Sequence, residues 1–64
     1  MRHESSKAII KCLENEGWYL ARVKVSHHQF KNESKSGRVT VPHPKANIYG
    51  DTLSSIYRQA GWEW

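Results

Sequence analysis

The sequence has few of the features that hold a small protein together or carry it across a membrane. Cys12 is the only cysteine, so no disulfide can form within the chain. No apolar run approaches the ~18 residues that a membrane span needs, and no apolar stretch follows Met1 as a signal peptide requires. We therefore exclude a disulfide scaffold and a spanning helix, and expect a cytoplasmic protein without membrane contact.

The chain is also short and poor in acidic residues. Its 64 residues carry 10 Lys+Arg against 6 Asp+Glu, a formal net charge of +4. This length predicts a single domain over residues 1–64 with a thin core, because folding at this size buries only ~60 % of the chain's surface. A nucleotide-binding α/β fold and a deep, loop-walled cleft do not fit. The excess positive charge indicates a polyanionic partner such as nucleic acid.

Apolar spacing and turn residues predict the order α-β-β-β-α. The expected elements are a helix over 5–16, strands over 18–25, 28–32 and 38–41, a loop over 44–49, and a helix capped by Asp51 or Thr52 that ends at Gly61. Cys12 lies on the apolar stripe of the first helix, so we expect a packed, inert thiol. The economical packing is an α+β fold, with a three-stranded antiparallel sheet and both helices on one face. This is the topology of a double-stranded-RNA-binding domain.

Strand alternation predicts which side chains point away from the helices. In the first strand, the apolar set expected to face inward is Tyr19, Ala21, Val23 and Val25. In the other two strands the inward set is Phe30, Val39 and Val41, with His28 at the edge of the core. The open face then gathers His27 and the cations Arg22, Lys24, Lys31 and Arg38, together with Leu20, Gln29 and Thr40.

The residues available for chemistry favour acid/base catalysis. Adjacent His27 and His28 point to opposite faces of a strand, so they do not share a metal ion, and we predict no metal and no cofactor. The open face lacks paired carboxylates and a glycine-rich phosphate loop. RNA supplies its own nucleophile, the 2′-hydroxyl. A histidine can move its proton, while Lys and Arg stabilise the charge that develops on phosphorus.

Four sequence blocks resemble the HicA-type mRNA interferase toxins. The blocks are residues 17–24 (GWYLARVK), 26–31 (SHHQFK), 37–45 (GRVTVPHPK) and 52–61 (TLSSIYRQAG). The resemblance implies a double-stranded-RNA-binding-like fold and a metal-independent endoribonuclease of a type II toxin–antitoxin pair. It further implies a HicB-type antitoxin that covers the active surface and contacts operator DNA, so that this chain meets DNA only indirectly.

The resemblance also assigns residues. It implies that the catalytic histidine is His27, which strand alternation places on the cationic face. On this interpretation we expect Arg22, Lys24, Lys31, Arg38 and Lys45 to contact the RNA, and Ser26, His28 and Gln29 to support the site. Val25 stands where the family usually has glycine, and a β-branched residue is strained there if the turn needs a positive φ. Asp51 lies near a position that is commonly basic in the family. Trp62 and Trp64 lie outside the motif, and either pack on the core or contact bases or the antitoxin.

Two other functions stay open at the level of sequence. A non-catalytic RNA-binding module needs the same basic face but no histidine. A protein captured by its antitoxin in a transcriptional repressor complex needs neither cleavage nor free RNA binding. RNA cleavage in EDTA separates the first from a nuclease, and co-purification with a neighbouring gene product reveals the second.

Overall fold

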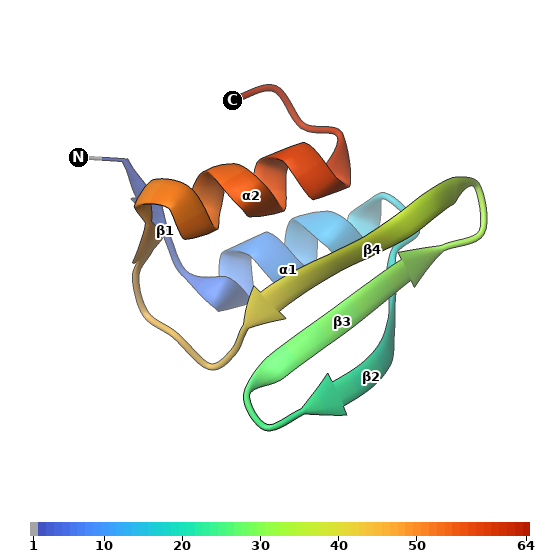
Figure 1. The fold of residues 1–64 in the computed structure, drawn as a ribbon, viewed down its shortest axis with the longest axis horizontal. Helices are drawn as coiled ribbons and strands as arrows, with labels where there is room; N and C mark the ends of the chain where they lie inside the picture. The colour runs from blue at the N-terminus through green and yellow to red at the C-terminus, as the bar shows by residue number, and fades with distance from the viewer. Residues whose placement is uncertain (1) are drawn as a thin grey trace.

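The computed structural model describes residues 2–64, which form two helices and two antiparallel sheets (Figure 1). The elements are β1 (His3–Glu4), α1 (Ser6–Asn15), β2 (Tyr19–Lys24), β3 (His27–Asn32), β4 (Lys35–Pro42), β5 (Ile48–Tyr49) and α2 (Gly50–Ala60). The three-stranded sheet has the order β2-β3-β4, and both of its pairs are antiparallel. The predicted α+β class and the double-stranded-RNA-binding-like order of helices and strands are confirmed. Neither helix is long and apolar enough to cross a membrane.

The ends of both helices follow from local chemistry. The Ser5 hydroxyl caps α1 by accepting the Ala8 N–H at 3.1 Å. Glycines with positive φ, Gly17 at 92° and Gly61 at 78°, follow the two helices as predicted, because glycine enters the left-handed region without steric cost. The start of α2 differs from the expectation. Its N-cap is Tyr49, whose backbone is extended and whose side chain makes no capping hydrogen bond.

That extended backbone belongs to a short ladder that the sequence did not reveal. β1 pairs with β5, with His3 opposite Tyr49 and Glu4 opposite Ile48. The expectation of an unbroken loop over 44–49 is therefore wrong at its last two residues. A two-residue strand is too short to show an alternating pattern. The pair ties the start of the described chain to the start of α2.

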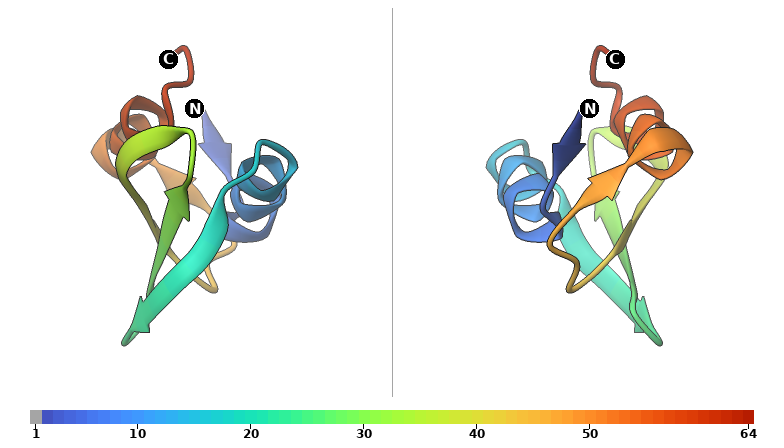
Figure 2. Two further views of the ribbon diagram at one scale, coloured as in Figure 1. Left: turned by 90° about the vertical axis from the view of Figure 1, so that its right-hand side faces the viewer. Right: turned by 90° about the vertical axis from the view of Figure 1, so that its left-hand side faces the viewer.

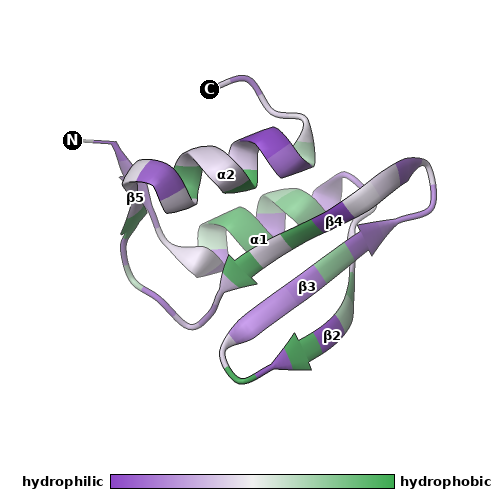
Figure 3. Cartoon of the chain, in the orientation of Figure 1, coloured by the Kyte–Doolittle hydropathy of each residue, from purple (hydrophilic) through white to green (hydrophobic). Residues whose placement is uncertain are grey.

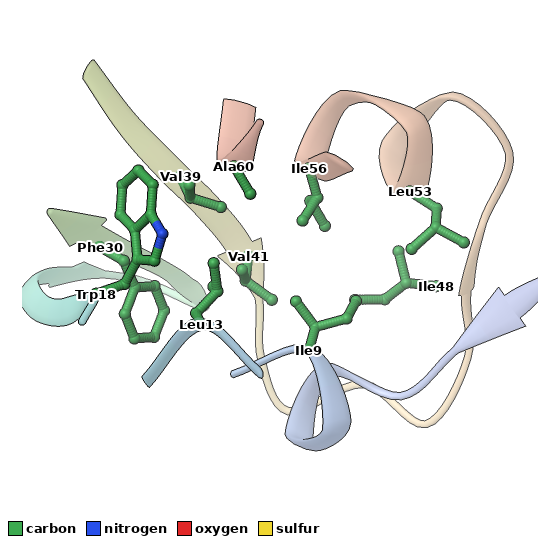
Figure 4. Packing of buried hydrophobic residues seen from close by; sticks show 10 residues of the cluster. All are labelled: Ile9, Leu13, Trp18, Phe30, Val39, Val41, Ile48, Leu53, Ile56 and Ala60. Atoms are coloured by element: carbon green, nitrogen blue, oxygen red, sulfur yellow. The ribbon is translucent and has the colours of Figure 1, made fainter. Parts of the chain in front are cut away.

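The core lies against one face of β3 and β4 (Figure 4). The buried cluster consists of Ile9, Leu13, Trp18, Phe30, Val39, Val41, Ile48, Leu53, Ile56 and Ala60. Both helices contribute to it, so both cover the face that carries Phe30, Val39 and Val41. The prediction that Cys12 is packed in the core is wrong, because its side chain is exposed. It lies beside the helical stripe of Ile9 and Leu13 rather than within it.

The β2–β3 hairpin extends beyond the helices, with its turn at the end of the molecule opposite both termini (Figure 2). Every residue of β2 is exposed. The register places Leu20 opposite Phe30 but Arg22 opposite Gln29, so Ala21 is an extra residue in a β-bulge. The bulge reverses the predicted faces at the start of β2, where Leu20 shares the inner face with Phe30 and Tyr19 lies on the opposite face with Lys31.

The two turns of the sheet differ from the predicted ones, because the first is shifted back by one residue and the second is tighter. Val25 and Ser26 alone join β2 to β3, and Glu33 and Ser34 alone join β3 to β4. The third strand therefore begins at Lys35 and not at Arg38. Val25 was expected to face inward, but it lies in the first turn, 91 % exposed and with φ of 58°. A β-branched residue is strained in that region.

The chain ends pack together beside α2. Trp62 contacts the core cluster and donates its indole N–H to Glu16 at 2.8 Å. Trp64 is 54 % exposed and lies edge-on to Tyr57, while the Arg2 guanidinium stacks on both rings. Burial, together with a hydrogen bond to Glu4, raises the pKa of Tyr57. Packing of the tail on the core is confirmed for Trp62, and the aromatic residues of the tail lie on the helix side.

Ser6 fastens the loop after β4 to the start of α1. Its hydroxyl oxygen accepts the Lys45 N–H at 2.8 Å and lies 3.1 Å from the Lys45 carbonyl and 2.7 Å from His43 Nδ1. The Ser6 N–H also donates to the Lys45 carbonyl at 2.9 Å. Ser6 is 1 % exposed, so these contacts replace water entirely. The loop is therefore held by one buried hydroxyl.

Replacing Val25 by glycine should stabilise the protein. Relief of a left-handed conformation, which costs about 1–2 kcal/mol, outweighs the entropy that glycine loses on folding. We expect the free energy of unfolding to rise by about 1 kcal/mol and Tm by about 4–8 °C. Thermal unfolding followed by circular dichroism measures this. Val25→Ala, which keeps the strained φ, should stay near the wild type, and an unchanged or lower Tm for Val25→Gly would contradict the account.

Replacing Ser6 by alanine should destabilise the protein. The part-buried Lys45 N–H loses its acceptor, which costs about 1–3 kcal/mol. Urea unfolding should show a lower midpoint at an unchanged slope. Lys7→Ala, on the same turn of α1 but exposed, serves as the control and should change little. Equal stability of Ser6→Ala and Lys7→Ala would show that the loop is held by other contacts.

Candidate nucleic-acid interface

The face of β2, β3 and β4 that points away from the core is called the outer face below. Cross-strand partners lie on the same face, so the register and the inward position of Phe30 identify its members. Two rows cross all three strands: Lys24, His27 and Pro42; Arg22, Gln29 and Thr40. Tyr19 and Lys31 form a further pair, and Arg38 joins this face by its hydrogen bond to Gln29 and by its place next to buried Val39. The outer face is therefore continuous across all three strands.

The outer face is uniformly basic. The predicted cations Arg22, Lys24, Lys31 and Arg38 all belong to it, and all four are exposed. None of the residues of β2, β3 and β4 is Asp or Glu. In Figure 3 most of β3 carries the hydrophilic colour, whereas the core-facing parts of β4 are hydrophobic. The strands thus gather much of the positive charge of the chain on one side.

Lys45 does not belong to the outer face. It lies in the loop after β4, where its backbone bonds to Ser6 at the start of α1, and its side chain is exposed. Lys35 is a further cation of β4 for which the sequence predicted no role. Its ammonium lies over the Trp18 ring, 6.0 Å from the ring centroid, and so sits beside the core rather than among the four cations.

His27 begins β3 directly after the turn and is exposed. Lys24 lies opposite it on β2 and Pro42 opposite it on β4. The turn is fixed to β4 because the Ser26 carbonyl accepts the His43 N–H at 2.8 Å. The structure therefore presents the imidazole at one end of the outer face, next to a cation and on a restrained turn.

Gln29 holds one of the cations in place. Its side-chain oxygen accepts a hydrogen bond from Arg38 Nη1 at 2.9 Å. Gln29 lies two residues after His27 on the same face, so the amide stands between the imidazole and Arg38 along the sheet. The structure thus couples Gln29 to Arg38, and the guanidinium is oriented before any ligand binds.

His28 lies on the inner face, where the alternation placed it. It is half-buried, opposite Val23 and Val41, and its ring meets the His43 ring edge-on at 4.9 Å. Its Nδ1 is buried without a hydrogen-bond partner among residues 2–64. His28 and His27 point to opposite sides of the sheet.

The bulge adds Tyr19 to the outer face. The sequence analysis placed this residue inward, because Tyr19, Ala21 and Val23 alternate without interruption. Tyr19 is opposite Lys31 and 48 % exposed. No signal in the sequence marks the bulge, since neither a glycine nor a polar residue stands at Ala21. An aromatic ring therefore lies beside Lys31 on the outer face.

The chemistry available on the outer face is proton transfer next to positive charge. An imidazole titrates near neutrality and can accept or donate a proton, while guanidinium and ammonium groups stabilise a phosphate. Within residues 2–64, no three His, Cys, Asp or Glu side chains come together in a way that could hold a metal ion. The arrangement suits a polyanion whose reaction requires movement of protons.

Comparison with known proteins gives one family. The model of the family described as HicA toxin of bacterial toxin–antitoxin matches residues 6–62 of the 64. A comparison with curated proteins gives no match. The matched range contains both helices, the whole of the outer face and every predicted site residue. The chain therefore belongs to the HicA toxin family.

Proposed function

We propose that this toxin is a metal-independent endoribonuclease that cleaves mRNA in the cytoplasm, with His27 as its catalytic acid/base. The observation that carries the proposal is the position of His27, which is exposed on a face with four cations and no carboxylate. Membership of a toxin family supports it, because a toxin must act on an essential cellular component. Cleavage of mRNA by a basic surface meets that requirement.

The proposed reaction uses the substrate's own nucleophile. The 2′-hydroxyl oxygen attacks phosphorus while an imidazole takes its proton, the bond from phosphorus to the 5′-oxygen breaks, and that oxygen gains a proton. The products are a 2′,3′-cyclic phosphate and a 5′-hydroxyl. Lys24, directly across from His27, stabilises the charge that develops on the phosphate oxygens.

The remaining cations bind the RNA backbone. Arg22, Lys31 and Arg38 extend from His27 along the sheet, so the bound strand runs in the direction of β3. Gln29 is a positioning residue that keeps Arg38 in place, and Ser26 fixes the turn that carries His27. His28 supports the same region from the inner face. Lys45 extends the contacts past the end of β4.

The antitoxin partner is proposed to be a HicB-type protein. A toxin of a toxin–antitoxin pair has a cognate antitoxin, and an outer face open to RNA is equally open to a covering protein. Such a partner would carry its own DNA-binding part, so this chain would meet operator DNA only through it. Co-purification of the chain with the product of the adjacent reading frame tests the pairing.

Removing the imidazole should abolish cleavage but leave binding intact. We expect His27→Ala to cleave RNA about 10²–10⁴-fold more slowly, as the loss of an acid/base group predicts. Labelled mRNA in EDTA, resolved by gel electrophoresis, measures the rate. His3→Ala removes an exposed histidine far from the outer face and should cut like the wild type. Full activity of His27→Ala would overturn the catalytic assignment.

A 2′-deoxynucleotide at the scissile position should block cleavage of an otherwise normal RNA. The attacking oxygen is then missing, whereas the phosphate contacts are retained. Binding without any cleavage of normal RNA, in EDTA or with added Mg²⁺, would instead identify a non-catalytic RNA-binding module. Cleavage of the 2′-deoxy substrate would show that water or another group is the nucleophile.

Each cation of the outer face should contribute to the salt dependence of RNA binding. Loss of one phosphate contact lowers the slope of log Kd against log salt concentration by ~0.7 for a single strand. We expect Arg22→Ala, Lys31→Ala and Arg38→Ala, each made in the His27→Ala background, to show this change by fluorescence anisotropy. Lys11→Ala changes the charge equally, but on the exposed side of α1, and should leave the slope unaltered.

A further inference from the structure

We propose that Tyr19 is a stacking platform for an unpaired base of the bound RNA. The inference rests on the proposed function, and it assigns the outer face to a single-stranded segment of RNA rather than to a duplex. It also gives a role to an aromatic residue that neither the alternation pattern nor the family motif had placed among the RNA contacts.

The position of Tyr19 follows from the strand register. Lys31 points away from the core because its neighbour Phe30 is 1 % exposed, and Tyr19 is the cross-strand partner of Lys31. The bulge at Ala21 lets Tyr19 share this face with Arg22, although the two are three positions apart in the sequence. The phenol therefore belongs to the same surface as the cations and His27.

The exposure of Tyr19 contrasts with that of its neighbour. Trp18 is 2 % exposed and belongs to the core, whereas Tyr19 is 48 % exposed. The chain thus buries one aromatic ring of the pair and leaves the other available on the basic side. Aromatic side chains interleaved with cations are the usual means of binding single strands, in which bases stack on the rings and phosphates meet the cations.

The chemistry of stacking selects unpaired RNA. In a duplex both faces of each base are already covered by neighbouring bases, so a ring on an open sheet gains nothing from it. An unpaired base can be turned out onto an aromatic side chain. Lys31 beside Tyr19, and Arg38 oriented by Gln29, would hold the phosphates on either side of the stacked base.

The platform lies away from the scissile bond. Lys31 lies four positions after His27 in β3, which is about 13 Å along an extended strand. The stacked base is therefore not part of the nucleotide that is cleaved. Tyr19 would position the strand and favour binding, so a substitution there should raise KM and leave kcat nearly unchanged.

The test uses RNA binding in the His27→Ala background, where the strand stays intact. We expect Tyr19→Leu to weaken binding of a fluorescent single-stranded oligoribonucleotide about 5- to 150-fold, and Tyr19→Phe to stay within about twofold. A duplex of the same sequence should bind equally to all three proteins. Tm of each variant should match the parent, because the Tyr19 side chain lies outside the core cluster.

Oligonucleotides with one abasic position distinguish stacking from a general structural role. At the stacked position, removal of the base should weaken binding to the protein with Tyr19 and have no further effect on Tyr19→Leu. Equal losses for both proteins at every position would overturn the proposal. So would a Tyr19→Leu variant that binds single strands normally but loses affinity only for the antitoxin.

The cleavage assay keeps this proposal separate from the nuclease itself. With His27 present, cleavage by a Tyr19→Leu variant with unchanged KM would overturn the stacking platform and support the nuclease. Binding that depends on Tyr19 and on a particular base, without cleavage by the parent chain, would overturn the nuclease and support the platform.

Discussion

Burial of one face of β3 and β4 is the constraint on which the remaining structure depends. Phe30, Val39 and Val41 are at most 1 % exposed, so the residues that alternate with them must face solvent. This alternation brings His27 and the cations to one surface. A register slip of one residue would exchange the two faces, so the core and the outer face are specified together.

The backbone at Val25 is strained, and this turn directly precedes His27, the proposed catalytic residue. Only the first of the two turn residues has a positive φ, a pattern in which that position favours glycine. The ladders on both sides and the hydrogen bond from His43 to Ser26 hold the turn in this form. Backbone strain is often concentrated at functional sites, where the surrounding structure over-determines it. Here it accompanies the presentation of His27 at the end of the sheet.

Sequence patterns predicted the parts of this fold in which a buried side chain determines which residues face inward. Phe30 fixed the parity of β3, which placed His27 and Lys31 outward and His28 inward, and the glycines after both helices marked their ends. The predicted faces were wrong at the start of β2. None of its side chains is buried, so its apolar alternation carried no information about the bulge at Ala21. The predicted burial of Cys12 was wrong for a related reason, since helical spacing identifies the apolar stripe of a helix but not where that stripe ends. The β1–β5 pair was too short to leave a pattern.

An open, basic sheet face suits a reaction in which the substrate brings its own nucleophile. Such a protein needs no cleft, and a chain of 64 residues has too little core to build one. Phosphate contacts alone bind every RNA sequence alike, so any preference must come from groups that meet bases. On the outer face, Tyr19 is the aromatic side chain that the register leaves exposed. The bulge at Ala21 therefore does more than bend an edge strand, because it moves the Tyr19 ring from the core side to the outer face, where RNA is proposed to bind.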